Sequence, residues 1–203
     1  MRCKPGRRRS ASGSDLWQHP SPAQARARVA RKLGRLAWLG LALLACAPAT
    51  AVEPKSLALM DFELIDEMRQ YESAQARRET DRRLVLITSE LAQEFARRDM
   101  YRVVDPAPAA QLIEKLKASY ELRACNGCEI DIGKALGADR VALCWVQKVS
   151  NLILNINISV QSVPTGETVY AKSVDIRGNT DEAWLRGVRR LVDNIQERNH
   201  HTR

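Results

Sequence analysis

Histidine is scarce in this chain of 203 residues, which has only His19, His200 and His201. No histidine lies between positions 20 and 199, so Ser-His-Asp and Cys-His nucleophilic sites lack their usual base. Zinc sites that need histidine, including HExxH, are excluded there as well. No glycine-rich G-x-G-x-x-G or G-x-x-x-x-G-K-[ST] loop occurs, which removes the common nucleotide-binding motifs. These absences indicate a binding or scaffolding protein rather than an enzyme, with no cofactor and no metal.

A basic surface is also absent from most of the chain, although the formal net charge is +8 and the pI is about 9.5. Residues 1–51 hold ten of the 32 Lys/Arg residues but one of the 24 acidic residues, so 22 basic and 23 acidic residues remain in 52–203. The basic pI therefore belongs to the N-terminal segment. It predicts no nucleic acid partner.

No apolar run is long enough for a permanent membrane span, which needs about 20 residues. The run LAWLGLALLAC, at 36–46, follows a basic segment and precedes Ala49-Thr50-Ala51, which has the A-x-A form of a signal peptidase site. This pattern predicts an N-terminal extension and signal peptide over 1–51, cleaved before Val52, and export to the periplasm. Two alternatives remain: an uncleaved short anchor, and a lipid anchor on Cys46.

The region 52–199 alternates segments of strand and helix length, which predicts a single α/β domain. Strands are expected at 57–64, 101–105, 141–149, 152–163 and 167–176, and helices before Arg98, after Pro108, at 129–137 and from 179 onward. In 152–163 leucine and isoleucine alternate with asparagine and serine, which predicts one buried and one solvated face. The expected fold is a mixed sheet of about five strands with four flanking helices. It ends in a hairpin and a helix, followed by a disordered tail at 200–203.

Four segments resemble a family of exported bacterial proteins known as domain of unknown function 2380. They read LALMDFELID, RVVDPA, LGADRVALCWVQKVSNL and TGETVYAKSVDIRGNTDEAWLRGVRRLV, and they cover nearly all of 56–196. The layout of elements is also similar to the N-terminal domain of the TolB envelope protein and to the curli-secretion lipoprotein family. The resemblance implies envelope assembly or peptide binding, and it brings no catalytic residues.

Three carboxylates are candidate ligand-facing residues. Asp61 and Asp66 lie along and after the first expected strand, and Asp105 ends the second. Open α/β sheets bind ligands at the carboxyl ends of their strands. The competing interpretation is that these residues are solvated turn formers, which is the commoner role of acidic residues at strand ends.

Beyond the leader the chain has three cysteines, Cys125, Cys128 and Cys144. Export favours a disulfide between Cys125 and Cys128, because Asn126-Gly127 between them readily forms a turn. A redox-active pair and half of a metal site are the alternatives. Cys144, in an apolar strand, is expected to be a buried, inert thiol.

The sequence thus predicts an exported periplasmic domain that binds or scaffolds an envelope protein or a peptide. The strand at 152–163, or the edge of its hairpin, is a surface to which a partner strand could be added. The alternative function is a periplasmic thiol-disulfide oxidoreductase that uses Cys125 and Cys128. A catalytic pair is reduced more easily than a structural bridge.

Overall fold

Strand β1 (Ser56–Ile65) lies inside the sheet and buries both of its faces. The computed structural model describes residues 53–201. Leu57 and Leu59 pack into one hydrophobic cluster, whereas Ala58 and Met60 pack into a second cluster on the opposite face. A strand covered on both faces needs apolar residues at successive positions, which explains the continuous apolar run of its sequence.

The five strands form one mixed sheet in the order β2-β1-β3-β4-β5. Strand β1 is parallel to both β2 (Arg102–Val103) and β3 (Arg140–Lys148). Strands β4 (Ile153–Ser162) and β5 (Thr168–Arg177) continue the sheet antiparallel, so β5 is an edge strand.

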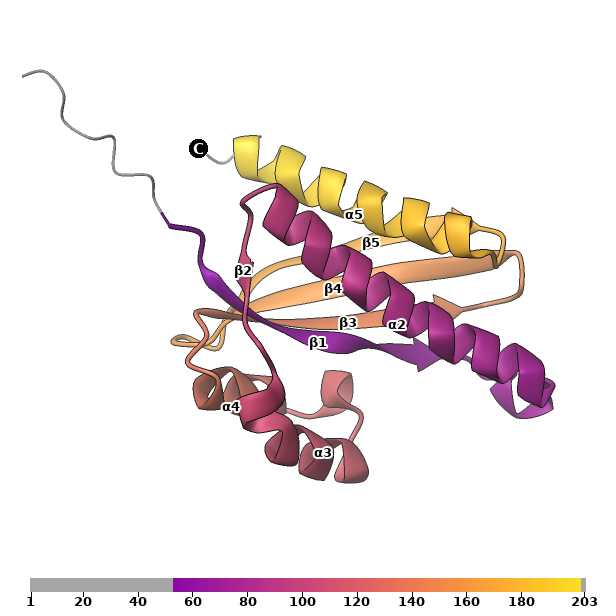
Figure 1. Ribbon diagram of the computed structural model, residues 1–203, viewed down its shortest axis with the longest axis horizontal. Coiled ribbons are helices and arrows are strands. Elements are labelled where there is room, and N and C mark those ends of the chain that lie inside the picture. Colours follow the sequence, from indigo (N-terminus) through magenta and orange to yellow (C-terminus); the bar gives the residue numbers. More distant parts are fainter. Residues whose placement is uncertain (1–52, 202–203) are drawn as a thin grey trace, which may run out of the picture. The chain divides into compact units, whose positions relative to one another are not determined.

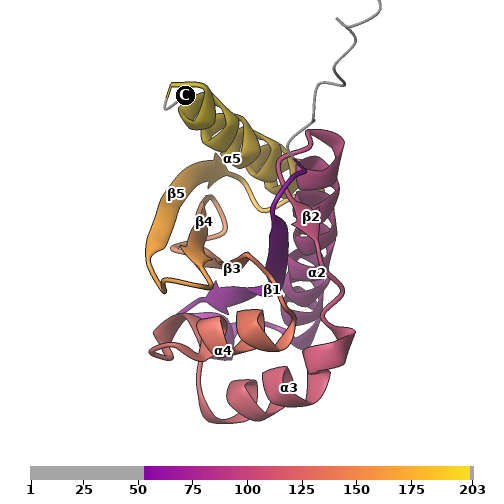
Figure 2. The ribbon, with the colours of Figure 1, turned by 90° about the vertical axis from the view of Figure 1, so that its left-hand side faces the viewer.

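The helices cover the two faces unequally (Figures 1 and 2). Helices α2 (Ala74–Arg97) and α5 (Asp181–His201) lie side by side on one face, where the larger hydrophobic cluster forms. Helices α3 (Ala110–Ser119) and α4 (Cys128–Ala135) lie on the other face, with the 3-10 turns η2 (Ala107–Ala109) and η3 (Leu122–Ala124). They pack over β1 and β3 and leave that face of β4 and β5 without a helix.

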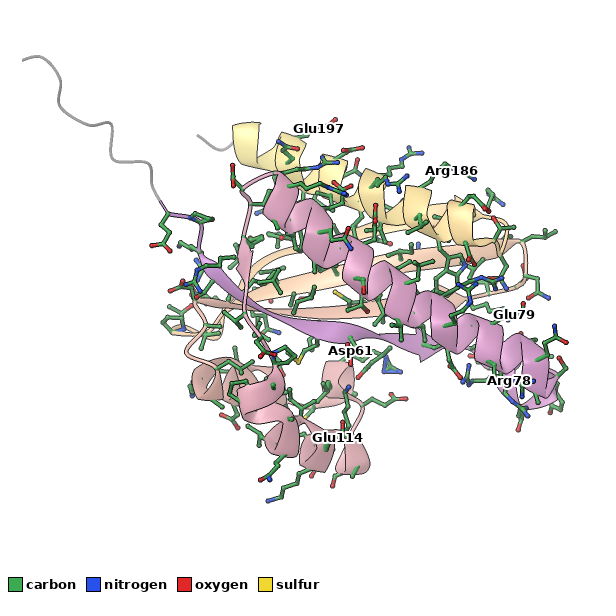
Figure 3. The ribbon with its side chains drawn as sticks, viewed as in Figure 1. Asp61, Arg78, Glu79, Glu114, Arg186 and Glu197 are labelled. Atoms are coloured by element: carbon green, nitrogen blue, oxygen red, sulfur yellow. A yellow bond between two sulfur atoms is a disulfide. The ribbon has the colours of Figure 1, made fainter. Side chains whose placement is uncertain are left out.

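Asp61 is the one exposed residue among the first seven of β1, because the strand contains a bulge there. The register with β3 shifts between Leu59 and Phe62. Since strand side chains alternate with a period of two, the extra residue lets Met60 and Phe62 each face a buried layer while Asp61 points outward. Lys117 of α3 donates to Asp61 at 3.1 Å. Figure 3 labels Asp61 on β1.

The predicted fold class is confirmed: one mixed sheet of five strands carries four α-helices in the described residues. The alternation of β4 is confirmed as well, since its fully buried side chains are Leu154, Ile156, Ile158 and Val160. Helix α5 runs to His201, two residues beyond the domain boundary expected from the sequence. The expected cleavage residues Ala49, Ala51 and Val52, and the lipid-anchor alternative at Cys46, lie outside the described residues.

Two carboxylates with lowered pKa values, Asp139 and Asp181, should make the fold sensitive to acid. The backbone N–H and the hydroxyl of Ser56 donate to Asp139 at 2.9 and 2.8 Å and lower the pKa of that carboxyl below its ordinary value. Arg82 and Arg83 do the same for Asp181. A carboxyl with a lowered folded-state pKa stabilises the fold above the unfolded-state pKa of about 4, and this contribution is lost as the pH falls through the folded-state pKa. We therefore expect Tm to fall as the pH drops below about 4, and to fall less steeply in Asp139→Asn. Equal slopes for the two proteins, measured by calorimetry, would contradict this.

Candidate functional site

The carboxyl ends of β1 and β3 hold a buried cluster of three charges. Lys148, the last residue of β3, has a side chain that is 4% exposed and an ammonium group 3.2 Å from Asp66 Oδ2. Glu72, which follows the 3-10 turn η1 (Arg69–Tyr71), accepts a hydrogen bond from the same ammonium group. Two carboxylates enclose one lysine, so this cluster holds the end of β3 to the segment that follows β1.

Exposed apolar side chains gather around this cluster, on η1 and on the turn between β3 and β4. We call this surface the apolar end; it consists of Met68, Tyr71, Val149, Leu152 and Ile153. Their exposed fractions run from 41% at Ile153 to 73% at Tyr71. Met68, Tyr71 and Val149 line a shallow cavity of about 320 Å³ together with Lys148. Clustered exposed apolar residues of this kind mark interaction surfaces more often than isolated ones do.

The three carboxylates predicted as ligand-facing are not brought together. Asp66 lies in the Lys148 cluster, Asp61 faces α3, and Asp105 accepts a hydrogen bond from the backbone of Ala107 at 3.0 Å. Lys148 was not among the residues singled out from the sequence. Its only signal was a lysine near the end of the mostly apolar segment VALCWVQKV.

Cys125 and Cys128 form a disulfide with a Cα–Cα distance of 5.6 Å. Gly127 between them has φ of +99°, a conformation that glycine adopts without strain, so the expected Asn-Gly turn is present. Cys128 is buried and Cys125 packs against the same cluster under α4. Burial of Cys144 is confirmed, and desolvation raises the pKa of its thiol.

Removing the disulfide should cost a modest amount of stability. We expect the double variant Cys125→Ser and Cys128→Ser to lose about 2 kcal/mol of unfolding free energy, because a four-residue loop gives up little chain entropy on closure. Urea unfolding measures this difference, with the wild-type protein under reducing conditions as the control. If the double variant and the reduced wild type both match the oxidised protein, the bridge does not stabilise the fold.

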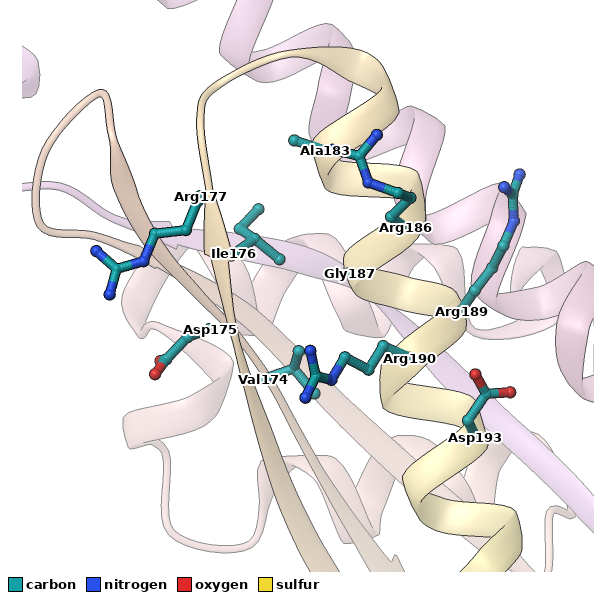
Figure 4. A pocket seen from close by; sticks show the side chains of 10 residues that line it. All are labelled: Val174, Asp175, Ile176, Arg177, Ala183, Arg186, Gly187, Arg189, Arg190 and Asp193. Carbon is teal, nitrogen blue, oxygen red and sulfur yellow. The ribbon is translucent and has the colours of Figure 1, made fainter.

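The edge strand β5 borders a groove of about 540 Å³ beside α5 (Figure 4). The groove has an apolar floor that includes Ile176 and Gly187, and a rim that includes Arg186 and Arg190. A Cβ at Gly187 would lie 2.8 Å from Ile156 Cδ1, so glycine is what lets α5 approach the sheet here. Charged side chains on an edge usually prevent the addition of another strand. This edge is therefore a weaker candidate for a peptide site than the apolar end.

The described part of the chain has neither a metal-binding cluster nor a membrane-spanning helix. Residues 53–201 contain no group of three or more His, Cys, Asp or Glu side chains placed to hold a metal ion. None of the helices in this range is long and apolar enough to cross a membrane.

Several solved structures share a distant likeness with this chain. The LpoB C-terminal domain from Escherichia coli is 16% identical over 66% of this chain and 88% of its own, with a TM-score of 0.41. A PelC dodecamer from Paraburkholderia phytofirmans is 10% identical over 70% of this chain and 87% of its own, with a TM-score of 0.44. TolB from Acinetobacter baumannii is 7% identical over 64% of this chain and 25% of its own, with a TM-score of 0.37. At such identities and scores these likenesses carry no conclusion about function. No curated protein matches the chain.

A family model, in contrast, matches most of the folded part. It spans residues 55–195, from the residue before β1 into the last turns of α5. This match confirms the resemblance expected from the sequence. The chain belongs to the family described as "Protein of unknown function (DUF2380)".

Proposed function

We propose that this protein is an exported binding domain of the bacterial envelope that docks a second protein through its apolar end. The observation that carries the proposal is the gathering of Met68, Tyr71, Val149, Leu152 and Ile153 on one end of the sheet. These five are most of the exposed large apolar side chains of the described part, where the others are Val85 and Tyr120. Burying such a surface against a partner removes it from water.

Charge argues for a partner with basic residues beside its own apolar surface. On the η1 side of the apolar end there are three carboxylates, Asp66, Glu67 and Glu72. Two cations lie beside them: Lys148 of the buried cluster, and Arg77, which donates to the backbone oxygen of Glu72 at 3.0 Å. Arg69 is already paired with Asp81 at 2.7 Å. This side therefore carries an acidic surplus, which lysine or arginine of a partner would complement. A symmetric contact between two copies would place the acidic surplus of one copy against that of the other. An anionic lipid surface would likewise place negative charge against it.

The position of the apolar end suits a domain attached through its N-terminus. The chain enters β1 at Ser56, and the apolar end follows Ile65 at the other end of the strand. The ten extended residues of β1 place the start of the strand and the apolar end about 30 Å apart. An uncleaved leader or a lipid anchor on Cys46 would join the domain ahead of Ser56, whereas the apolar end follows the opposite end of β1.

Photo-crosslinking in the native bacterium tests the proposal. A benzoylphenylalanine placed at Tyr71 should form an adduct with one other protein, and the same group at Val85, exposed on α2, should not. Leu152→Glu should abolish the adduct, while the matched variant Val85→Glu should leave it. The purified partner should bind the wild type at least tenfold more tightly than Leu152→Glu, and more weakly as salt is raised.

Three outcomes would contradict the proposal. One is the absence of an adduct at Tyr71, and another is an equal yield at Tyr71 and Val85. The third is an adduct of two copies of this chain, which would make the apolar end a self-association surface.

We infer that the Cys125–Cys128 bridge is structural rather than the redox centre of an oxidoreductase. Glu129 and Asp131, in the first turn of α4, oppose a thiolate at Cys128, and burial of Cys128 limits attack by an external thiol. We expect a reduction potential below about −300 mV. A higher potential, together with thiol-disulfide exchange activity, would support the oxidoreductase instead.

A further inference from the structure

The sheet face that α4 leaves open carries a third concavity, separate from the apolar end and from the groove beside β5. It has a volume of about 470 Å³ and lies between the disulfide loop and strands β3 and β4. We call it the Glu129 pocket. Its polar residues include Arg123 and Glu129, and its apolar residues are Ile65, Leu143 and Trp145.

Glu129 contributes a carboxylate that lacks one donor. The residue is 7% exposed, so it is more than nine-tenths buried. Its Oε1 accepts a hydrogen bond from Gln161 Nε2 at 3.0 Å, whereas Oε2 is buried without a hydrogen-bond partner among residues 53–201. Glu129 is the second residue of α4, so its carboxyl group lies at the positive end of the helix dipole. An anionic oxygen that is buried and unpaired is a place where a ligand can supply the missing donor.

The charges next to the pocket leave it negative. Arg123 is the cation that lines it, and its Nη1 donates to Glu121 at 2.6 Å. Its Nε lies 3.7 Å from Glu63, which also accepts a hydrogen bond from the backbone of Leu122 at 2.8 Å. Arg123 is therefore paired with two carboxylates, although its buried Nε has no hydrogen-bond partner among residues 53–201. With Glu129, three carboxylates stand against this one cation, so the surplus charge at the pocket is negative. The fitting ligand is a cation.

The remaining lining suits a cation carried on an alkyl chain. The indole of Trp145 is half-buried, and a tryptophan ring is the aromatic surface that attracts cations best. Ile65 and Leu143 supply apolar contact for a chain of methylene groups. We propose that the Glu129 pocket binds a primary alkylammonium group, with Glu129 Oε2 accepting its hydrogen bond and Trp145 packing against it.

Fluorescence titration of the exported protein tests this site at constant ionic strength. The probes are 1,5-diaminopentane, the neutral pentane-1,5-diol, and N-acetyl-lysine-N-methylamide. We expect a saturable change in tryptophan emission with the two amines and none with the diol. Trp145→Phe should remove the signal, because the other tryptophan of the described part, Trp184, is fully buried.

The variants separate the pocket from general charge effects. Glu129→Gln keeps the shape of the side chain and should weaken amine binding at least tenfold, whereas Glu114→Gln on the exposed side of α3 should change nothing. Trp145→Leu, followed by calorimetry, provides a second test if Glu129→Gln folds poorly. Tighter binding of the lysine derivative than of the diamine would identify a protein side chain as the source of the ammonium, and the reverse would identify a free amine. Three results would overturn the proposal: amine binding that survives Glu129→Gln, equal binding of the diol, or no saturation up to about 50 mM amine. The last concentration is about 100 times a Kd of about 0.5 mM, at which the site would be half filled.

Discussion

Replacing Lys148 by alanine is expected to lower the free energy of unfolding by about 3–5 kcal/mol, enough to unfold much of a marginally stable domain. The side chains of Lys148 and Asp66 are 4% and 2% exposed, so both charges are almost completely removed from water. Deleting the lysine leaves the carboxylates of Asp66 and Glu72 buried without their cation. The cost comes mostly from this desolvation and less from the attraction that is lost.

Urea unfolding of the wild type and three variants separates these contributions. Lys134→Ala serves as the matched control, because its pair with Asp131 spans 3.9 Å and both side chains are more than 60% exposed. We expect a change of at most about 1 kcal/mol there. The triple variant Lys148→Met, Asp66→Asn, Glu72→Gln removes all three charges together and should recover most of the loss. A small effect of Lys148→Ala would mean that water reaches the cluster.

Trp184→Ala should destabilise the protein by a similar amount, about 3–5 kcal/mol. Trp184 is fully buried in the cluster between α5 and the sheet, and its indole N–H donates to Asn179 Oδ1 at 2.9 Å. The truncation leaves a large cavity and removes the shorter of the two hydrogen bonds to Asn179 Oδ1, which also accepts from Arg83 Nη1 at 3.3 Å. Both consequences lower the stability of the folded state.

Trp145→Ala is the matched control for Trp184→Ala. Trp145 is half-exposed on the open sheet face, so its truncation removes less apolar area and should cost about 1–2 kcal/mol. The same variant should abolish amine binding at the Glu129 pocket. Equal losses of stability for the two tryptophans would mean that the open face is covered by something other than the described residues.

Periodicity in the sequence was sufficient to predict most of the secondary structure. In α5, Trp184, Val188, Leu191, Val192 and Ile195 recur at helical spacing, and all five are fully buried. In β4 the alternation of apolar and polar residues predicted which side chains enter the core. These patterns are local, because a helix or strand sorts its side chains between core and solvent with a fixed period.

Asp61 shows where a local pattern was insufficient. A carboxylate within an apolar run predicts either a buried, paired charge or a break in the strand, and the sequence does not choose between them. The bulge opposite β3 resolves this, because one extra residue rotates Asp61 outward toward Lys117. The bulge is a property of how two strands pair, so it depends on a segment about 80 residues away.

The amino-acid sequence by itself determined the family, the fold class and the order of strands and helices, and it predicted the Cys125–Cys128 pair. The tertiary structure decided which residues form the sites. Lys148 meets Asp66 and Glu72 across more than 75 positions, and Gln161 reaches Glu129 across 32. Secondary structure follows from interactions between near neighbours along the chain. A buried charge cluster or a pocket follows from contacts between distant segments, which no periodicity of the sequence records.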